Sequence, residues 1–140
     1  MPAEPFRLDT LRLRRDFLAA SRDGVKIGGP IIGLQMRDRG APETPARVGF
    51  TATKRVGGAV ERNRMKRRLR AAARSALAEV ARPGCDYVVI ARRAVLDAAF
   101  DRILRDLREA AKRAHGREKR TSPAPAGSPS APIDGRESGR

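Results

Sequence analysis

Seven positively charged side chains lie within thirteen residues of this sequence, and six of them are arginine: Arg62, Arg64, Lys66, Arg67, Arg68, Arg70 and Arg74. Only one acidic residue, Glu61, lies next to them, so salt bridges along a helix cannot account for the cluster. The planar guanidinium group of arginine binds phosphate through paired hydrogen bonds. Positive charges this close together repel one another, and a protein tolerates that repulsion where a bound polyanion neutralises the charges. The segment therefore predicts contacts with nucleic acid phosphates.

The sequence offers little for catalysis by the protein itself. No acidic pair, catalytic triad or metal-binding cluster stands out, and using Cys85 and His115 as nucleophile and base would require a fold contact that nothing in the sequence supports. One cysteine and one histidine cannot build a structural zinc site or an internal disulfide. We therefore expect neither catalytic residues nor a metal site in the protein.

The composition fits one small basic domain. The 140 residues include 31 Lys and Arg against 16 Asp and Glu, a formal net charge of +15. The last 25 residues are rich in Pro, Gly and Ser and carry five basic and three acidic side chains, so most of the net charge lies before them. We expect a folded domain over residues 1–115 and a disordered tail over residues 116–140. Without an apolar segment typical of a signal peptide or a membrane span, the chain is predicted to be cytoplasmic.

The patterns around the cationic segment predict a mixed α and β structure. A short helix near Phe17 should stop at Gly24, and a longer helix from Asp97 should end at Gly116. Three runs have the length and composition of strands: Pro30–Met36, Arg47–Thr53 and Asp86–Ala91. Residues 25–27 could form a fourth, shorter strand.

The cationic segment itself is predicted to be a helix over residues 59–80. A helical wheel places one apolar set on a single side, where it would face the sheet: Met65, Leu69, Ala72, Ala73, Ala76 and Val80. The cations then occupy an arc of roughly 200° on the remaining circumference. Because the apolar side is largely alanine and committed to the core, a membrane surface or calmodulin is a poor partner.

Two neighbouring features have both a functional and a structural interpretation. The strand end and turn at Thr51, Thr53, Lys54 and Arg55, followed by Gly57 and Gly58, would allow close backbone approach to phosphate, but they also suit a plain strand-to-helix turn. Phe17 could stack on a nucleic acid base or could be an ordinary core residue. The sequence leaves both questions open.

The run RVGFTATKRVGGAVERNRMKRRLRAAAR, from Arg47 to Arg74, resembles the signature region of the protein subunit of bacterial ribonuclease P. Its centre is the motif Arg62, Asn63 and Arg64, with LRLRRDFLAA upstream and GCDYVVIARR downstream. The resemblance implies a ribonucleoprotein that removes the 5′ leader of precursor tRNA, with catalysis by the RNA subunit and its magnesium ions. It also implies an α+β fold, a two-layer α/β sandwich of order αβββαβα with a left-handed crossover.

The resemblance further assigns residues to two RNA surfaces. The catalytic RNA would contact one set: Arg62, Asn63, Arg64, Lys66, Arg67 and Arg70. The leader would lie in a cleft between the first helix and the sheet, against Phe17, Thr51, Thr53, Lys54 and Arg55. Ser21 and Gln35 stand where relatives often have aromatic residues. The implied partners are the RNA subunit and precursor tRNA, with no membrane and no obligate protein partner.

A rival hypothesis is a non-catalytic RNA-binding module such as a ribosomal protein, which could share the basic helix and a small α/β fold. A DNA-binding regulator is less well supported, because no second helix is placed as a helix-turn-helix partner. Co-purification with one structured RNA and cleavage of precursor tRNA would separate ribonuclease P from a ribosomal protein.

Overall fold

The computed structural model describes residues 8–121 of the chain. It contains five strands, three α-helices and two short 3-10 helices, η1 and η2. In chain order they are β1 (Leu8–Thr10), α1 (Arg14–Asp23), β2 (Val25–Ile27), β3 (Ile32–Asp38), β4 (Ala46–Thr51), η1 (Lys54–Val56), α2 (Ala59–Val80), β5 (Cys85–Ala91), η2 (Arg93–Leu96) and α3 (Phe100–Thr121).

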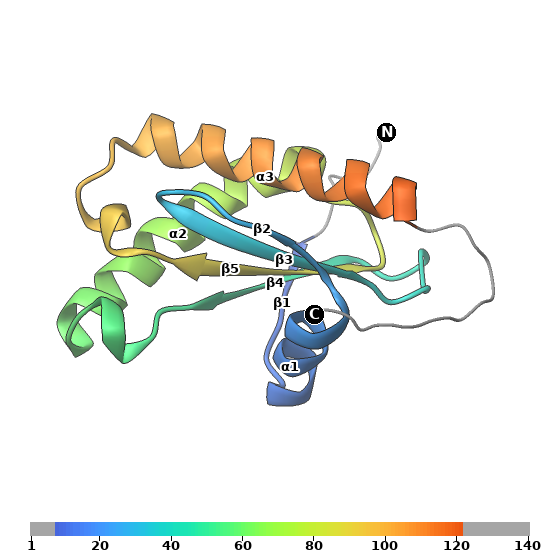
Figure 1. Cartoon of the computed structure of the whole chain (residues 1–140), viewed down its shortest axis with the longest axis horizontal. Coiled ribbons are helices and arrows are strands. Elements are labelled where there is room, and N and C mark those ends of the chain that lie inside the picture. Colours follow the sequence, from blue (N-terminus) through green and yellow to red (C-terminus); the bar gives the residue numbers. More distant parts are fainter. Residues whose placement is uncertain (1–7, 122–140) are drawn as a thin grey trace.

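The five strands form one mixed sheet in the order β1-β4-β5-β3-β2. β4 runs parallel to both β1 and β5, whereas β3 is antiparallel to β5 and to β2. Helices α2 and α3 cover one face of the sheet, and α1 alone packs on the opposite face (Figure 1). The chain is therefore a two-layer α+β structure with one additional small helix on the second face, which leaves part of that face uncovered.

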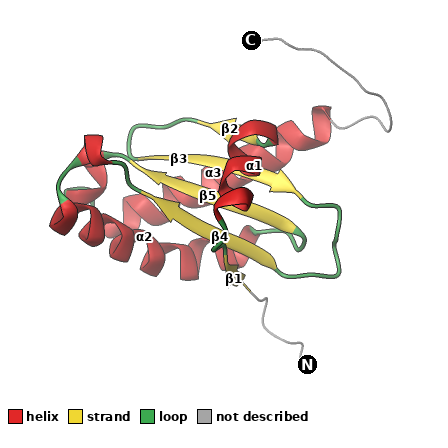
Figure 2. Ribbon diagram, turned by 90° about the horizontal axis from the view of Figure 1, so that it is seen from below, coloured by secondary structure: helices red, strands yellow, loops and turns green. Residues whose placement is uncertain are grey.

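The connection from β4 through α2 to β5 is left-handed. Seen from the α1 side, both strands point to the left, β5 lies above β4, and α2 passes behind the sheet (Figure 2). Crossovers between parallel strands of one sheet are right-handed in the great majority of proteins. The resemblance correctly predicted this exception, which the general rule would have missed.

The main core lies between the sheet and the two long helices. Its largest fully buried side chains come from both layers: Tyr87, Leu34, Met36, Met65, Leu69, Leu77, Ile103 and Leu107. A second, smaller cluster under α1 joins Leu11, Ala20 and Val88, with Phe17 and Ile90 packed against it. The site residues on α2 and α1 are thus held by separate apolar clusters on opposite faces of the sheet.

Sequence patterns placed most elements well and missed two features. The helix over residues 59–80 is confirmed, but the predicted order began with a helix, whereas the structure places β1 first. The prediction that Gly116 ends the last helix is wrong, because α3 continues to Thr121. Gly116 does not adopt the positive φ of a C-terminal cap, and good helix formers follow it. Residues 122–140 of the predicted tail lie outside the described residues.

A buried carboxylate connects the sheet to α1. Asp86 on β5 is fully buried and accepts hydrogen bonds from Arg47 on both oxygens, at 2.8 Å each, and from Arg39. The hydrogen bond to Asp86 raises the pKa of the Arg47 guanidinium. Arg47 also pairs with Asp16 of α1 at 3.4 Å, so this network fixes the helix that carries Phe17.

A second polar group, His115 on α3, lies beside a buried tyrosine. Tyr87 Oη accepts a hydrogen bond from the Arg82 backbone N–H at 2.8 Å and lies 2.7 Å from His115 Nε2. This distance fits a hydrogen bond between the two groups, and a neutral imidazole whose Nε2 carries no proton accepts it from the hydroxyl. Burial is the main cause that lowers the pKa of His115, to about 4, and the nearby Arg82 charge adds to it.

This arrangement predicts acid sensitivity of the fold. The unfolded chain, with a histidine pKa of about 6.5, takes up a proton as the pH falls, while folded His115 does not until about pH 4. The full shift would lower the free energy of unfolding by roughly 2 kcal/mol between pH 7 and pH 5; because His115 is only half-buried and solvent screens it, we expect a loss of about 1 kcal/mol. Denaturant titrations at both pH values should show this loss in the native protein and a smaller one in His115→Gln. Equal pH dependence in the two proteins would contradict the assignment.

Candidate nucleic-acid interface

The start of α2 is fixed by Glu61, the one acidic residue in its first turn. Glu61 Oε1 accepts a hydrogen bond from the Gly58 N–H at 3.1 Å, and the two carboxylate oxygens pair with Arg93 of η2 at 3.1 and 2.9 Å. The hydrogen bond from Arg93, and then that from Gly58, lower the pKa of Glu61. The carboxylate is thus already paired and does not neutralise the cations farther along the helix.

The turn before α2 requires glycine at one position. Gly57 has φ of 154°, and a Cβ there would lie 2.4 Å from Glu61 Oε1 and 3.0 Å from Arg93 Nη1. Arg93 Nη1 also donates to the Val56 carbonyl at 2.7 Å. Because Gly57 has no side chain, the Glu61 carboxylate can lie close to the backbone of this turn. Gly57 therefore has a structural role here, as the interpretation of a plain strand-to-helix turn predicts.

Two of the seven cations of α2 point back into the fold. Arg62 Nη1 donates to the Gly57 carbonyl at 3.0 Å, and Arg68 donates to the carbonyls of Val95 and, at 3.3 Å, Leu96 in η2. Both side chains are partly buried. These two arginines brace the turns at either side of the helix, a role that the helical wheel could not separate from RNA contact.

The other five cations of α2 have no hydrogen bond or ion pair within the described part of the chain. We call them the basic band: Arg64, Lys66, Arg67, Arg70 and Arg74. Four are exposed and Lys66 is partly buried. Met65 and Leu69, on the opposite side of the helix, are completely buried. The helix therefore presents unneutralised charge outward while its apolar side is committed to the core, which suits binding to a polyanion.

Three shallow hollows follow the exposed side of α2, and neighbouring hollows share residues. One of about 460 Å³ is lined by Val60, Asn63, Lys66, Arg67 and Arg70. A second, of about 430 Å³, shares Lys66 and Arg70 with the first, and a third, of about 410 Å³, shares Arg67. The basic band thus forms a continuous surface, with Asn63 inside it and partly buried Arg62 at its start.

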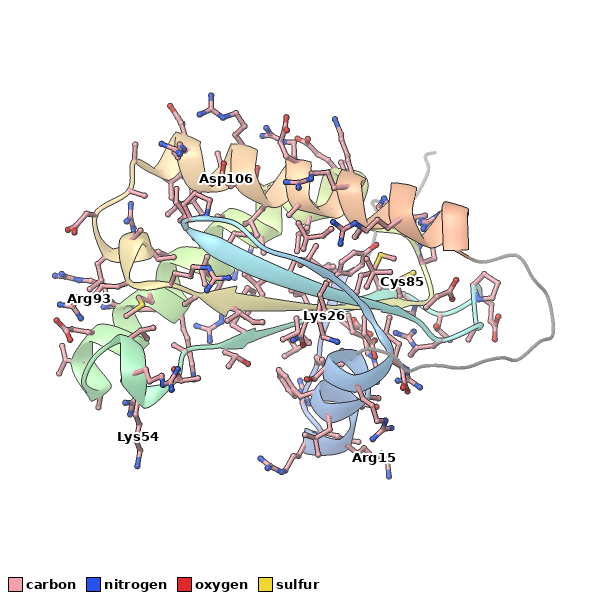
Figure 3. The ribbon with its side chains drawn as sticks, in the orientation of Figure 1. Arg15, Lys26, Lys54, Cys85, Arg93 and Asp106 are labelled. Atoms are coloured by element: carbon pink, nitrogen blue, oxygen red, sulfur yellow. The ribbon has the colours of Figure 1, made fainter. Side chains whose placement is uncertain are left out.

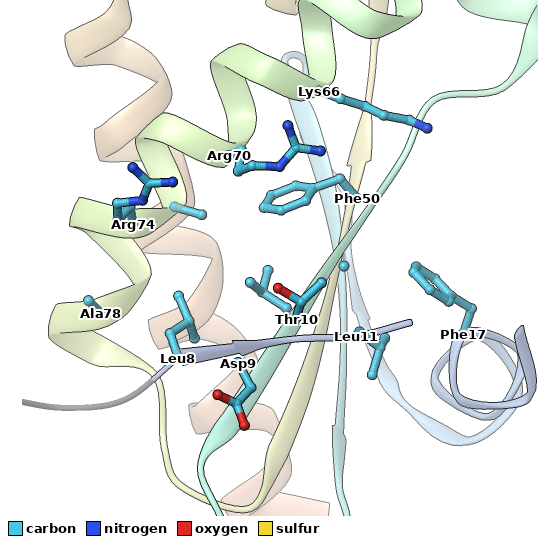
Figure 4. Close-up of a pocket in the computed structure, with 13 residues that line it drawn as sticks. Leu8, Asp9, Thr10, Leu11, Phe17, Phe50, Lys66, Arg70, Arg74 and Ala78 are labelled. Atoms are coloured by element: carbon cyan, nitrogen blue, oxygen red, sulfur yellow. The ribbon is translucent and has the colours of Figure 1, made fainter. Parts of the chain in front are cut away.

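The second hollow brings two aromatic rings to the free edge of β4. Phe17 projects into it from α1, while Phe50 of β4 lies on the other side, beneath Arg70 (Figure 4). The Arg70 guanidinium carbon is 5.9 Å from the centre of the Phe50 ring, a cation–π distance. β1 pairs with β4 only as far as Val48, so the strand edge is open from Gly49 onward.

The Phe17 ring owes its position to a glycine. A Cβ at Gly49 would lie 2.4 Å from Phe17 Cζ, so the ring packs directly on the β4 backbone. Phe17 is partly buried and contacts the small cluster under α1. It is therefore both a packed residue and a residue that lines an open hollow, and the two interpretations of its role are compatible.

The remaining residues predicted for the leader lie along the same face but do not line the Phe17 hollow. Thr51 is partly buried at the end of β4, in register with Ile90, while Thr53 precedes η1 and is exposed. Lys54 and Arg55 are exposed within η1. Figure 3 shows Lys54 extending from η1 toward the side of the sheet that carries α1. Lys54 therefore lies toward the α1 face, whereas Phe17 shares its hollow with Lys66 and Arg70.

Sequence reasoning missed two aromatic residues beside the basic band, Phe50 and Phe100. Alternation along β4 could have placed Phe50 with Val48 on the α2 face, but its contact with Arg70 depends on the crossover. Phe100 recurs at helical spacing with Ile103 and Leu107, which favours a place on the apolar side of the last helix and gives no sign of α2 as its neighbour. Ser21 is exposed and Gln35 is partly buried. Because neither side chain is aromatic, these two positions offer no ring for stacking.

Among residues 8–121, no three His, Cys, Asp or Glu side chains gather where they could hold a metal ion. Within the same part of the chain, no helix is both long and apolar enough to span a membrane.

Comparison with known proteins gives a consistent result. Residues 7–115 match the family described as Ribonuclease P. The chain is 48% identical over 104 residues to the ribonuclease P protein component of Caulobacter vibrioides, covering 74% of this chain and 69% of that protein. It is 47% identical over 110 residues to the component from Ruegeria pomeroyi, covering 77% and 87%. The solved RNase P protein from Thermotoga maritima superposes with a TM-score of 0.64 at 29% identity, over 75% of this chain and 96% of that one.

Proposed function

The chain belongs to the ribonuclease P protein family and is the protein component of the ribonucleoprotein that removes the 5′ leader from precursor tRNA, and on that premise we propose how its surfaces bind two different RNAs. The basic band on α2 binds the RNA subunit, and the α1 face holds the leader. The family assignment also decides against the ribosomal-protein hypothesis.

The observation that carries the first half of the proposal is the set of five unpaired cations on one side of α2. Four of them are arginines, which can each contact a phosphate through two N–H groups. Asn63 lies among them and can both donate and accept hydrogen bonds. Arg62 would contribute through the donors that do not bind the Gly57 carbonyl.

The second half rests on the uncovered part of the α1 face. Phe17 offers a ring on which a leader base can stack, while Thr51 and Thr53 offer hydroxyl groups. Lys54 and Arg55 add positive charge at the border of this face. A single strand can follow such a surface because stacking and backbone charge do not require a defined sequence.

The magnesium ions of the reaction are proposed to be held by the RNA subunit and the substrate. Among residues 8–121 no three His, Cys, Asp or Glu side chains gather around one point, and the part proposed for the protein is to bind and orient the two RNAs. We further propose a cytoplasmic holoenzyme that contains no other obligatory protein.

The proposed function is tested by cleavage of precursor tRNA at low magnesium concentration by the RNA subunit, with and without this protein. The added cations should offset repulsion between the two RNAs, so cleavage at the correct 5′ end should require less magnesium when the protein is present. An unchanged magnesium requirement would contradict the proposal.

Arg64→Ala and Arg67→Ala should each weaken binding to the RNA subunit without unfolding the protein. Both side chains are exposed, and each lost phosphate contact should flatten the slope of log affinity against log salt by up to about 0.7 to 0.9. Titrations of labelled RNA at several salt concentrations would measure this slope. Arg113→Ala is a matched control, because Arg113 is exposed on α3 in a hollow that also contains Asp106 and Glu109. Unchanged slope and affinity in the α2 variants would assign these arginines to solvent.

A further inference from the structure

Phe100, the first residue of α3, is exposed although it is a large aromatic residue. Its relative exposure is 40%, whereas Phe17 and Phe50 are partly buried and Tyr87 is fully buried. It lines the third hollow beside α2, together with Leu96, Ala71, Arg64, Arg67 and Arg68. An exposed ring at the border of a proposed RNA surface is a candidate for base contact.

The floor of this hollow is held in place by Arg68. Its guanidinium donates to the carbonyls of Val95 and Leu96, which fixes η2 against α2. Val95 is fully buried and anchors the same turn in the core. Hydrogen bonds and a buried side chain therefore fix the segment that leads into Phe100 next to Arg64 and Arg67.

The polar groups that line the hollow are all cations. Arg64 and Arg67 make no hydrogen bond or ion pair with residues 8–121, and no carboxylate is among the lining residues. The nearest acid on α2, Glu61, is paired with Arg93, and the charge of Asp97 also acts on Arg93. The charge of Arg64 also acts on Glu61, but less than the Arg93 pair does. The hollow thus combines one aromatic ring with two guanidinium groups that have no hydrogen-bond or ion-pair partner among residues 8–121, which favours an anion that carries a flat ring.

We propose that this hollow is a docking site for one unpaired nucleotide of the RNase P RNA, with its base stacked on Phe100 and its phosphate bound by Arg64 and Arg67. The inference rests on the proposed function of the basic band and adds base contact to it. An unpaired nucleotide suits the hollow because a base within a helix is stacked on its neighbours and cannot offer its face to a side chain.

The site is continuous with the rest of the basic band through Arg67, which also lines the hollow around Asn63. The same RNA strand could therefore contact both hollows. The leader is a poor occupant, because the α1 face lies on the other side of the sheet from α3 (Figures 1 and 2).

The test measures affinity for the complete RNase P RNA, and for precursor and mature tRNA in the holoenzyme, with Phe100→Ala, Phe100→Leu and Phe100→Trp. Stacking on an aromatic side chain corresponds to about 5-fold to 150-fold in affinity, and an open site such as this one should lie at the low end. We expect Phe100→Ala and Phe100→Leu to weaken binding to the RNA subunit about 5-fold or more, and Phe100→Trp to bind at least as well as the native protein. The salt slope should not change, because no phosphate contact is lost.

Two results would overturn the inference. One is native affinity for the RNA subunit in Phe100→Ala, and the other is full recovery by Phe100→Leu, which would indicate apolar packing instead of stacking. Melting temperatures of all variants identify any loss caused by unfolding. If Arg67→Ala weakens RNA binding but Phe100→Ala does not, only this inference fails. If Arg67→Ala also has no effect, the proposed function of the basic band fails as well.

Discussion

Phe17→Ala is expected to weaken the holoenzyme's affinity for precursor tRNA by about 5-fold to 150-fold while changing its affinity for mature tRNA little. Only the precursor carries a leader that can occupy the α1 face, and stacking of a base on an aromatic ring contributes about 1 to 3 kcal/mol. Equilibrium binding of both tRNAs to holoenzymes assembled with native and variant protein measures the difference. With Ser21 and Gln35 in place of other rings, we expect Phe17 to carry more of the stacking on this face; if Lys54 and Arg55 hold much of the leader, the effect should fall at the low end of this range.

Two further variants separate leader binding from packing. Leu18→Ala removes the adjacent side chain, which is 48% exposed, and should leave both affinities near native values. Gly49→Ala keeps the Phe17 ring but introduces a Cβ at 2.4 Å from its Cζ, so the ring must move and precursor binding should again fall. If Phe17→Ala is stable and loses affinity for both tRNAs equally, Phe17 does not act as a leader platform.

Leu69→Ala is expected to reduce the free energy of unfolding by about 2 to 5 kcal/mol. Leu69 is completely buried between α2 and the rest of the main core, and truncating it removes apolar contacts and leaves a cavity. Denaturant-induced unfolding, followed by circular dichroism, measures this loss. RNA binding should be retained at low temperature, where most of the variant is still folded.

The matched control on the same helix is Val60→Ala. Val60 is 82% exposed, so losing its methyl groups should change the free energy of unfolding by less than about 0.5 kcal/mol. Comparable destabilisation by the two substitutions would mean that the buried side of α2 had been assigned incorrectly.

The periodicity of α2 allowed its bounds and its buried side to be predicted, since apolar residues recur at every turn on the side of an amphipathic helix that faces the core. The same periodicity could not distinguish Arg62 and Arg68, which hold neighbouring turns, from the cations that remain unpaired. Their partners are backbone carbonyls, and because every residue has a carbonyl, the sequence does not show which of them accepts a hydrogen bond. The division of the cations into bracing and free groups is therefore a tertiary property.

Features set by long-range pairing were also hidden. β1 is a three-residue strand whose pairing with β4 involves residues far along the chain, and it has no clear alternation of its own. Asp86 is a charged residue near the start of an otherwise apolar strand, and its burial is explained only by the guanidinium groups of Arg39 and Arg47 that pair with it. Phe100 likewise acquires its position beside the basic band only through the packing of η2 on α2.

The division of the two RNA surfaces can be measured directly with a hydroxyl-radical probe attached to an introduced cysteine. The one native cysteine, Cys85, is 2% exposed, so labelling should favour the new position. In the assembled holoenzyme with precursor tRNA, a probe at Asn63→Cys should cleave the RNA subunit, and a probe at Thr53→Cys should cleave the leader. Cleavage of the leader from position 63, together with cleavage of the RNA subunit alone from position 53, would contradict the proposed assignment of the surfaces.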